Sequence, residues 1–178
     1  MSEATPVLHA TTIALHRGGR WRGVLVQGPS GAGKSDLALR AMSHGWRLVA
    51  DDRTLVWTSG GRLFGRAHPR LSGLIEARGL GIAPAPPLGF AELVLAVGCE
   101  PGAAVDRFPE PERMELLGVE LPLVRLCPSE ASAPTKLELA LLLQSVRFDT
   151  CRNERIEPSR GRGDPSGAGA QGVRERNV

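Results

Sequence analysis

Residues 28–35 read Gly-Pro-Ser-Gly-Ala-Gly-Lys-Ser, which matches the phosphate-binding pattern G-x-x-x-x-G-K-[ST] at every fixed position. Glycines let the backbone N–H groups of such a loop surround a phosphate, and the N-terminus of the following helix adds positive charge. In this pattern the lysine reaches the terminal phosphates and the hydroxyl that follows it can bind Mg²⁺. We therefore predict a nucleotide-phosphate site made of Gly28, Pro29, Ser30, Gly31, Ala32, Gly33, Lys34 and Ser35.

An ordinary glycine-rich turn is the alternative interpretation of this segment. Lys34 and Lys136 are the only lysines among 22 Lys and Arg residues, so the chain uses arginine almost wherever it needs a cation. A lysine at the pattern's own position, between an apolar run and a helical segment, favours the phosphate site over the turn.

Two adjacent acids, Asp51 and Asp52, follow the apolar run 46–50. If that run is a strand of an open parallel sheet, its C-terminal end lies beside the phosphate loop. A carboxylate there can hold Mg²⁺ or accept the proton of an incoming hydroxyl. Paired Asp residues also begin many solvated turns, so it is their position that favours a function.

Three further places leave alternatives open when only the residue types are considered. Glu76 and Arg78 lie among glycines, either as a solvated ion pair or as a metal or phosphate contact. His9, in the run before the phosphate loop, reads as a structural histidine, and Asp106 with Arg107 as a surface pair.

The apolar pattern predicts the elements that position these residues. We expect a hairpin from residues 7–15 and 23–27, and a helix over residues 33–43. Further strands are expected over 46–50, 54–58, 62–64, 92–97 and 121–126, loops over 71–89 and 98–111, and a last helix over 136–148 that packs against the sheet. A strand, a phosphate loop, a helix and a strand open an α/β domain.

Composition limits the class of protein. With 178 residues, 42% of them hydrophobic, the chain can form one compact domain, which we place at residues 1–150, followed by a Gly- and Arg-rich tail at 151–178 that we expect to be disordered. No apolar stretch approaches the roughly 20 residues that span a bilayer, and no secretory signal is visible, so we expect a cytoplasmic protein without a membrane contact. Residues 152–178 carry +2 of the net charge of +3 and leave the rest of the chain near neutral, so we expect no nucleic-acid binding. Cys99, Cys127 and Cys151 have no metal-binding spacing and read as buried thiols.

Several of these segments, taken in order, resemble the catalytic domain of HPr kinase/phosphorylase over about residues 7–148. The segments are His9, the run from Gly23 through the phosphate loop to Leu39, Arg47-Leu-Val-Ala-Asp51-Asp52, Ile75-Glu76-Ala-Arg78-Gly-Leu-Gly-Ile82, Asp106-Arg107 and Leu117-Gly-Val-Glu-Leu-Pro122. The Val-Ala-Asp-Asp and Glu-x-Arg-Gly-Leu-Gly-Ile segments are the specific ones, because many families share the phosphate loop.

The resemblance implies an α/β fold with a phosphate-loop sheet and flanking helices, and an enzyme that uses ATP and Mg²⁺ to phosphorylate a serine of the phosphocarrier protein HPr. Many members also reverse this reaction by phosphorolysis, and self-assembly into a homo-oligomer is a further expectation. The implied roles are contact with the transferred phosphate for Lys34, Mg²⁺ binding for Ser35 and Glu76, proton transfer for Asp52 with Asp51 beside it, tuning of that acid by His9, stabilisation of phosphoryl charge by Arg107, and a place in the site for Arg78 and Gly79.

One departure from the family pattern favours the kinase over the phosphorolysis reaction. After Leu126 the family usually has an arginine-containing Pro-Gly turn linked to dephosphorylation, whereas this chain reads Cys127-Pro-Ser-Glu. Two other functions remain as alternatives: a phosphate-loop kinase that acts on a small metabolite, and a regulator that senses a nucleotide without transferring phosphate.

Overall fold

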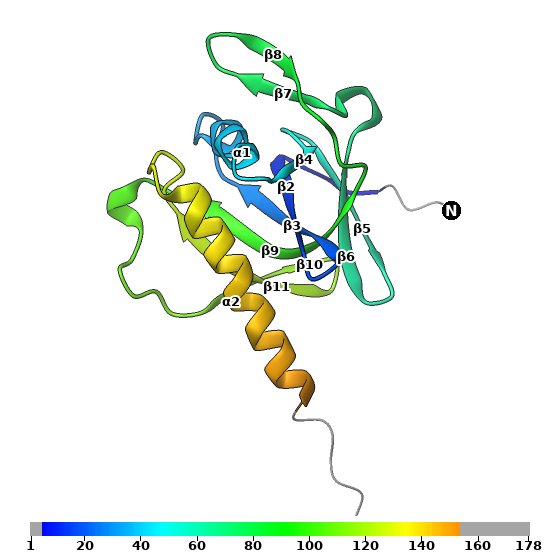
Figure 1. Cartoon of the computed structure of the whole chain (residues 1–178), viewed down its shortest axis with the longest axis vertical. Coiled ribbons are helices and arrows are strands. Elements are labelled where there is room, and N and C mark those ends of the chain that lie inside the picture. Colours follow the sequence, from blue (N-terminus) through cyan, green and yellow to red (C-terminus); the bar gives the residue numbers. More distant parts are fainter. Residues whose placement is uncertain (1–4, 154–178) are drawn as a thin grey trace, which may run out of the picture.

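The structure, a computed structural model, describes residues 5–153 and shows a curled sheet with two helices and a separate hairpin (Figure 1). The helices are α1 (Lys34–Met42) and α2 (Ala133–Asn153). The strands are β1 (Val7–Leu8), β2 (Ala10–Arg17), β3 (Arg20–Gln27), β4 (Arg47–Ala50), β5 (Thr54–Ser59), β6 (Arg62–Ala67), β7 (Leu74–Ala77), β8 (Gly81–Pro84), β9 (Ala91–Cys99), β10 (Glu112–Leu116) and β11 (Val119–Leu126). The α/β class predicted from the sequence is confirmed.

The nine-stranded sheet is mixed, whereas the placement of Asp51 and Asp52 from the sequence assumed an open parallel sheet. Its main path runs β1-β5-β6-β9-β3-β2-β4, and β11 pairs with β9 and carries β10 at its other edge. Strands β3, β9 and β11 are parallel, whereas β2 returns antiparallel to β3 because the two form a hairpin. Strand β4 then pairs antiparallel to β2 and so runs in the same direction as β3. The C-terminal end of β4 therefore still reaches the edge at which the phosphate loop lies.

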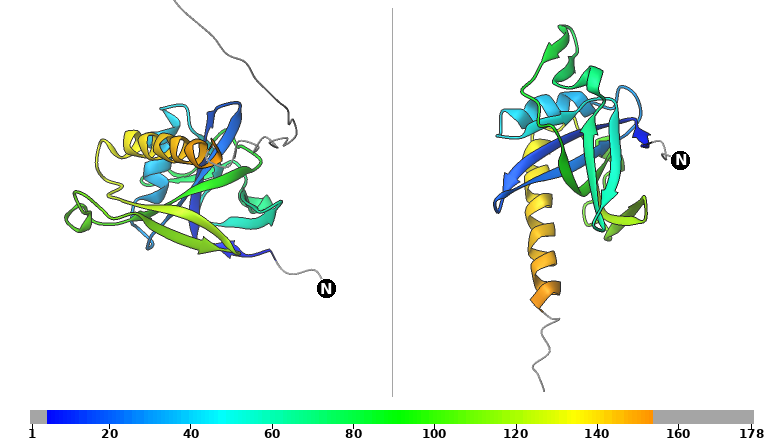
Figure 2. Two further views of the ribbon diagram at one scale, coloured as in Figure 1. Left: turned by 90° about the horizontal axis from the view of Figure 1, so that it is seen from below. Right: turned by 90° about the vertical axis from the view of Figure 1, so that its right-hand side faces the viewer.

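Side chains alternate between the two faces of the sheet, and each face has a core. On β3, Val24 and Val26 pack with the helices in the larger core, while Leu25 belongs to a second cluster that includes Val56 of β5 and Leu121 of β11. The curl of the sheet brings β5 and β6 round to enclose this second cluster (Figure 2). Both faces of β3 are buried, which holds the strand that leads into the phosphate loop in place.

Helix α2 begins at Ala133, earlier than predicted, and its first turns pack on the sheet through Leu137 and Leu141. Leu139, Leu142 and Leu143 remain exposed, and the rest of the helix extends beyond the body of the molecule (Figure 2). The predicted tail lies outside the described residues from position 154 onward. Within the described part of the chain, neither helix is long and apolar enough to cross a membrane.

Strands β7 and β8 form a hairpin, whereas the sequence predicted a loop over residues 71–89. The hairpin forms its own two-stranded sheet above α1 and β4 (Figure 1). The strands are short and their Gly and Pro residues are typical of loops, so the sequence pattern did not indicate them. Only one face of the hairpin packs on the protein, through Ile75, which is buried in the main core. Strand β10 was also missed, because its Glu-Arg-Met-Glu-Leu sequence is dominated by charges. Residues 100–111 form the predicted loop apart from one short turn of 3-10 helix.

Candidate active site

The phosphate loop joins β3 to α1 and leaves the start of the helix uncapped. Gly33 occupies the N-cap position with a left-handed backbone at φ 93°, and no side chain bonds to the first turn. Gly31 also has a positive φ, at 79°. These conformations favour glycine and direct backbone amides into the loop, which is the arrangement that binds phosphate at a helix N-terminus.

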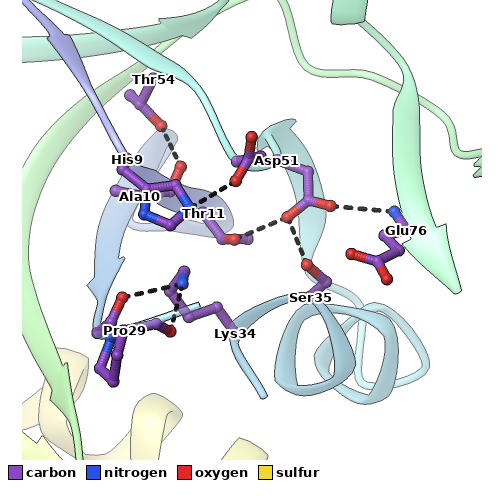
Figure 3. A network of polar contacts seen from close by, with 11 residues as sticks. His9, Ala10, Thr11, Pro29, Lys34, Ser35, Asp51, Thr54 and Glu76 are labelled. Atoms are coloured by element: carbon purple, nitrogen blue, oxygen red, sulfur yellow. Dashed lines mark hydrogen bonds and ion pairs between the residues drawn. The ribbon is translucent and has the colours of Figure 1, made fainter. Parts of the chain in front are cut away.

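Lys34 lies inside the loop, with only 6% of its surface exposed. Its ammonium group donates hydrogen bonds to the carbonyl oxygens of Gly28 and Pro29, both at 3.0 Å (Figure 3). The side chain is thus held against the loop by main-chain acceptors. A phosphate that entered the loop would meet a positive charge already in position.

The phosphate loop packs closely against Cys99 and Pro128, which leave no space for a side chain at Gly28 or Gly33. A Cβ atom on Gly28 would lie 2.8 Å from the Cβ of Cys99, at the end of β9. On the other side, a Cβ on Gly33 would lie 3.3 Å from Pro128, whose carbonyl oxygen accepts a hydrogen bond from Arg40 of α1. The segment after β11 therefore helps to shape the loop.

Two thiols in these neighbouring segments have shifted pKa values. Burial raises the pKa of Cys99 to about 11, although the charge of Lys34 acts in the opposite direction. The pKa of Cys127 is lowered, mainly by its hydrogen bond with the Ser129 hydroxyl, 3.1 Å away. Cys99 thus packs beneath the loop as an uncharged thiol. Both are free cysteines, as predicted, while the side chain of Cys151 is outside the described part.

Asp51 is buried at the end of β4 and accepts three hydrogen bonds. Its Oδ1 atom accepts from the hydroxyls of Thr11, at 2.7 Å, and Ser35, at 2.9 Å (Figure 3). Its Oδ2 atom accepts from the backbone N–H of Glu76, at 3.0 Å. This one carboxylate therefore ties together β2, α1 and the β7–β8 hairpin.

Asp52, unlike Asp51, is exposed to solvent. Its side chain is 60% exposed, and its Oδ1 atom lies 2.6 Å from Nε2 of His9, which is itself 52% exposed. The backbone of Asp52 is left-handed, with φ 62°, and the N–H of Arg53 donates to the carbonyl oxygen of Asp51 across it, at 2.7 Å. A three-residue turn of this hand is rare and strained. With this backbone conformation the carboxylate of Asp52 is exposed to solvent, whereas that of Asp51 is buried.

The β7–β8 hairpin supplies the opposite wall. Glu76 is exposed, and its carboxylate points toward Ser35 (Figure 3). The guanidinium of Arg78 lies over the phosphate loop, 4.0 Å from where a Cβ on Gly31 would be. Within residues 5–153, no ion pair joins Glu76 to Arg78. The solvated-pair interpretation is therefore not what the structure shows, since both residues face one cavity.

A cavity of about 740 Å³ brings most of the predicted residues together. The predicted residues that line it are His9, Ser30, Gly31, Ala32, Gly33, Lys34, Ser35, Asp51, Asp52, Glu76 and Arg78. Gly28 and Pro29 contribute carbonyl groups to Lys34 from behind. Gly79 is in the turn of the hairpin and Arg107 is in the exposed β9–β10 loop; neither lines the cavity.

Thr11 is a residue of the candidate site that the sequence did not reveal. It lines the cavity and is fully buried, and its hydroxyl orients the Asp51 carboxylate. Its position two residues after His9, facing the same side of the chain, was the available signal. A run of apolar residues, Leu71, Leu74, Leu80 and Ile82, also lines the cavity and was assigned to a loop.

The oxygen atoms around Ser35 fit a magnesium ion. The Ser35 hydroxyl and the Asp51 carboxylate are 2.9 Å apart, and the exposed Glu76 carboxylate faces them. No group of three or more His, Cys, Asp or Glu side chains suited to a metal occurs in the described part of the chain. Magnesium is commonly bound by one or two protein carboxylates together with substrate phosphates, so a site with few protein ligands is typical of this ion.

Comparison with known proteins identifies the relatives of this chain. Residues 7–86 match the family described as HPr Serine kinase C-terminal domain. The chain is 46% identical over 75 residues to the HPr kinase/phosphorylase of Clostridium tetani, covering 42% of this chain and 25% of that protein. It is 40% identical over 116 residues to the HPr kinase/phosphorylase of Streptococcus salivarius, covering 58% of this chain and 38% of that protein. The chain thus spans well under half the length of these curated relatives.

A solved structure extends the likeness to nearly the whole described fold. The Hpr(Ser) kinase/phosphatase from Coxiella burnetii superposes with a TM-score of 0.72 at 20% sequence identity, covering 85% of this chain and 99% of that one. At this identity the match concerns the fold. The resemblance to the HPr kinase/phosphorylase family that the sequence motifs predicted is confirmed.

Proposed function

Because residues 7–86 match the HPr Serine kinase C-terminal domain family, we propose that this chain is an ATP-dependent kinase that phosphorylates a serine of HPr. The observation that carries the proposal is the shared cavity, in which the phosphate loop faces an exposed acid, Asp52, that is paired with His9. A phosphate donor and a hydroxyl acceptor need these two features on opposite sides of one space.

Six residues of the cavity have a part in the proposed reaction. Asp52 accepts the proton of the serine hydroxyl, and His9, at 2.6 Å, orients the carboxylate and stabilises its charge. The serine oxygen forms a bond to the γ-phosphorus of ATP, the bond from that phosphorus to the bridging oxygen breaks, and ADP leaves. Lys34 and Arg78 stabilise the negative charge on the transferred group. Mg²⁺, held by Ser35 and Glu76, would supply further charge neutralisation.

Asp51 has a positioning role in this scheme. The two oxygens of the buried carboxylate accept three hydrogen bonds, and these fix the hydroxyl of Ser35 and the backbone of Glu76 relative to each other. These are the two residues proposed to hold the metal. The two adjacent acids therefore divide the work, because one is enclosed by donors and the other is open to the acceptor protein.

The experiment is phosphate transfer from labelled ATP to purified HPr in the presence of Mg²⁺. We expect label on a serine of HPr, and loss of transfer in the Lys34→Ala variant, because the ammonium inside the loop is removed. Lys136→Ala is the matched control, since this second lysine pairs with Glu130 on the surface. Adding inorganic phosphate to phosphorylated HPr tests phosphorolysis in the same assay. Label on a metabolite but not on HPr, or ATP binding without transfer to any acceptor, would overturn the proposal.

A further inference from the structure

The β7–β8 hairpin exposes apolar side chains beside the candidate active site. Leu80 is 89% exposed, Ile82 66% and Leu74 36%, and all three line the same cavity as the phosphate loop. The hairpin pairs with no strand of the main sheet and lies above it (Figure 1). Exposed apolar residues that cluster at the rim of a polar site commonly mark a binding surface.

The register of the hairpin places two of these residues around Glu76. Ile82 lies directly opposite Glu76 across the two strands, and Leu74 precedes Glu76 by two residues on the same face. The other face, with Ile75 and Ala77, is buried toward the core. One face of the hairpin therefore carries both the proposed metal ligand and an apolar surround that nothing in residues 5–153 covers.

The position of the proton acceptor indicates what approaches this face. The side chain of Asp52 is 60% exposed, and Asp52 lines the same cavity as the hairpin residues. An acid at the mouth of a cavity suits a hydroxyl on a large surface, which cannot enter a deep pocket. Any protein that brings a serine to Asp52 must come to rest against the exposed side of the hairpin.

We propose that Leu74, Leu80 and Ile82 form the docking surface for the phosphate-accepting protein, which presents apolar side chains next to its reactive serine. This inference rests on the proposed function, since it names how that function selects its acceptor. Burial of these side chains excludes water from the space between Asp52 and the phosphate loop and supplies binding energy away from the reacting atoms.

The test compares the variants Ile82→Ser and Leu80→Ser with the wild-type protein in the transfer assay with HPr. We expect the KM for HPr to rise about tenfold in each variant and further in the double variant, with KM for ATP and kcat at saturating HPr unchanged. Leu117→Ser is the control, because this leucine is 43% exposed in the distant β10–β11 turn and does not line the cavity. Calorimetric binding of HPr whose target serine is replaced by alanine measures docking without chemistry, and should weaken in parallel.

The outcomes separate the inference from the function on which it rests. If the wild-type protein phosphorylates HPr and Ile82→Ser does so with an unchanged KM, the docking surface is refuted while the kinase stands. If the substitutions change the size of the protein in chromatography and leave KM for HPr unchanged, the face binds a second copy of the chain, which also refutes it. If the wild-type protein transfers no phosphate to HPr, the proposed function fails and the inference fails with it.

Discussion

The Nε2 atom of His9 lies 2.6 Å from the Oδ1 atom of Asp52, although one residue follows β1 and the other follows β4. Strand β1 pairs with β5 and β2 pairs with β4, so the residue between β1 and β2 lies beside the turn that joins β4 to β5. The contact leaves both side chains more than half exposed. An exposed contact of this kind contributes little to stability, and its position in the cavity agrees with the role in proton transfer proposed above for Asp52.

Replacing the exposed acid is expected to remove transfer without removing nucleotide binding. In Asp52→Asn the amide keeps the shape of the side chain but accepts a proton poorly, so kcat for HPr phosphorylation should fall by about 10²-fold or more. ATP affinity, measured by calorimetry, should change less than threefold, because the phosphate loop is untouched. Full transfer by the Asn variant would exclude Asp52 as the base.

The strained backbone at Asp52 makes a separate prediction about stability. At φ 62° a residue with a Cβ atom is less favourable than glycine by about 1 kcal/mol, so Asp52→Gly should be more stable than Asp52→Ala by that amount. Both variants lack the carboxylate, so the comparison isolates the backbone. Urea denaturation of the two variants measures the difference in the free energy of unfolding. Equal stabilities would mean that the turn relaxes at no cost.

The phosphate loop and the acids were predictable because their chemistry is local. Residues 28–35 are contiguous in the chain, and their sequence pattern by itself indicates the conformation of a phosphate-binding loop. Asp51 and Asp52 were placed correctly at a strand end, although the sheet is mixed. The reason is that the antiparallel β2 intervenes between β3 and β4 and leaves both running in the same direction.

Residues that reach the site through tertiary structure were harder to predict. Thr11 is one of two adjacent threonines on β2, and its contact with Asp51 depends on the pairing of β2 with β4. The β7–β8 strands are short and interrupted by Gly and Pro, so no periodic pattern identified them. Arg107, assigned by resemblance, is exposed in a loop that does not line the cavity, and its proposed role in phosphoryl stabilisation stays a prediction.

The hydroxyl of Thr11 is expected to matter for metal use through Asp51. Thr11→Val removes one of three donors to a buried carboxylate, which should cost about 1–3 kcal/mol of unfolding free energy and loosen the link to Ser35. The Mg²⁺ concentration for half-maximal transfer should then rise. Thr12→Val is the matched control: Thr12 is equally buried, but its hydroxyl contacts Thr54 instead. It should lose stability while keeping the wild-type Mg²⁺ requirement, and a similar Mg²⁺ shift in both variants would contradict a positioning role for Thr11.

The two thiols beside the phosphate loop should react at different rates with an alkylating reagent, because alkylation proceeds through the thiolate. The pKa of Cys99 is raised to about 11 by burial, so at pH 8 it remains a protonated thiol, whereas the hydrogen bond with Ser129 lowers the pKa of Cys127. Iodoacetamide should therefore label Cys127 before Cys99 in the folded protein, as measured by peptide mass spectrometry. Because Cys127 precedes the proline that packs on Gly33, its modification should also weaken ATP binding. The Cys127→Ser variant serves as the control, since it should keep ATP affinity after treatment, and labelling of Cys99 first would contradict the order of thiol pKa values.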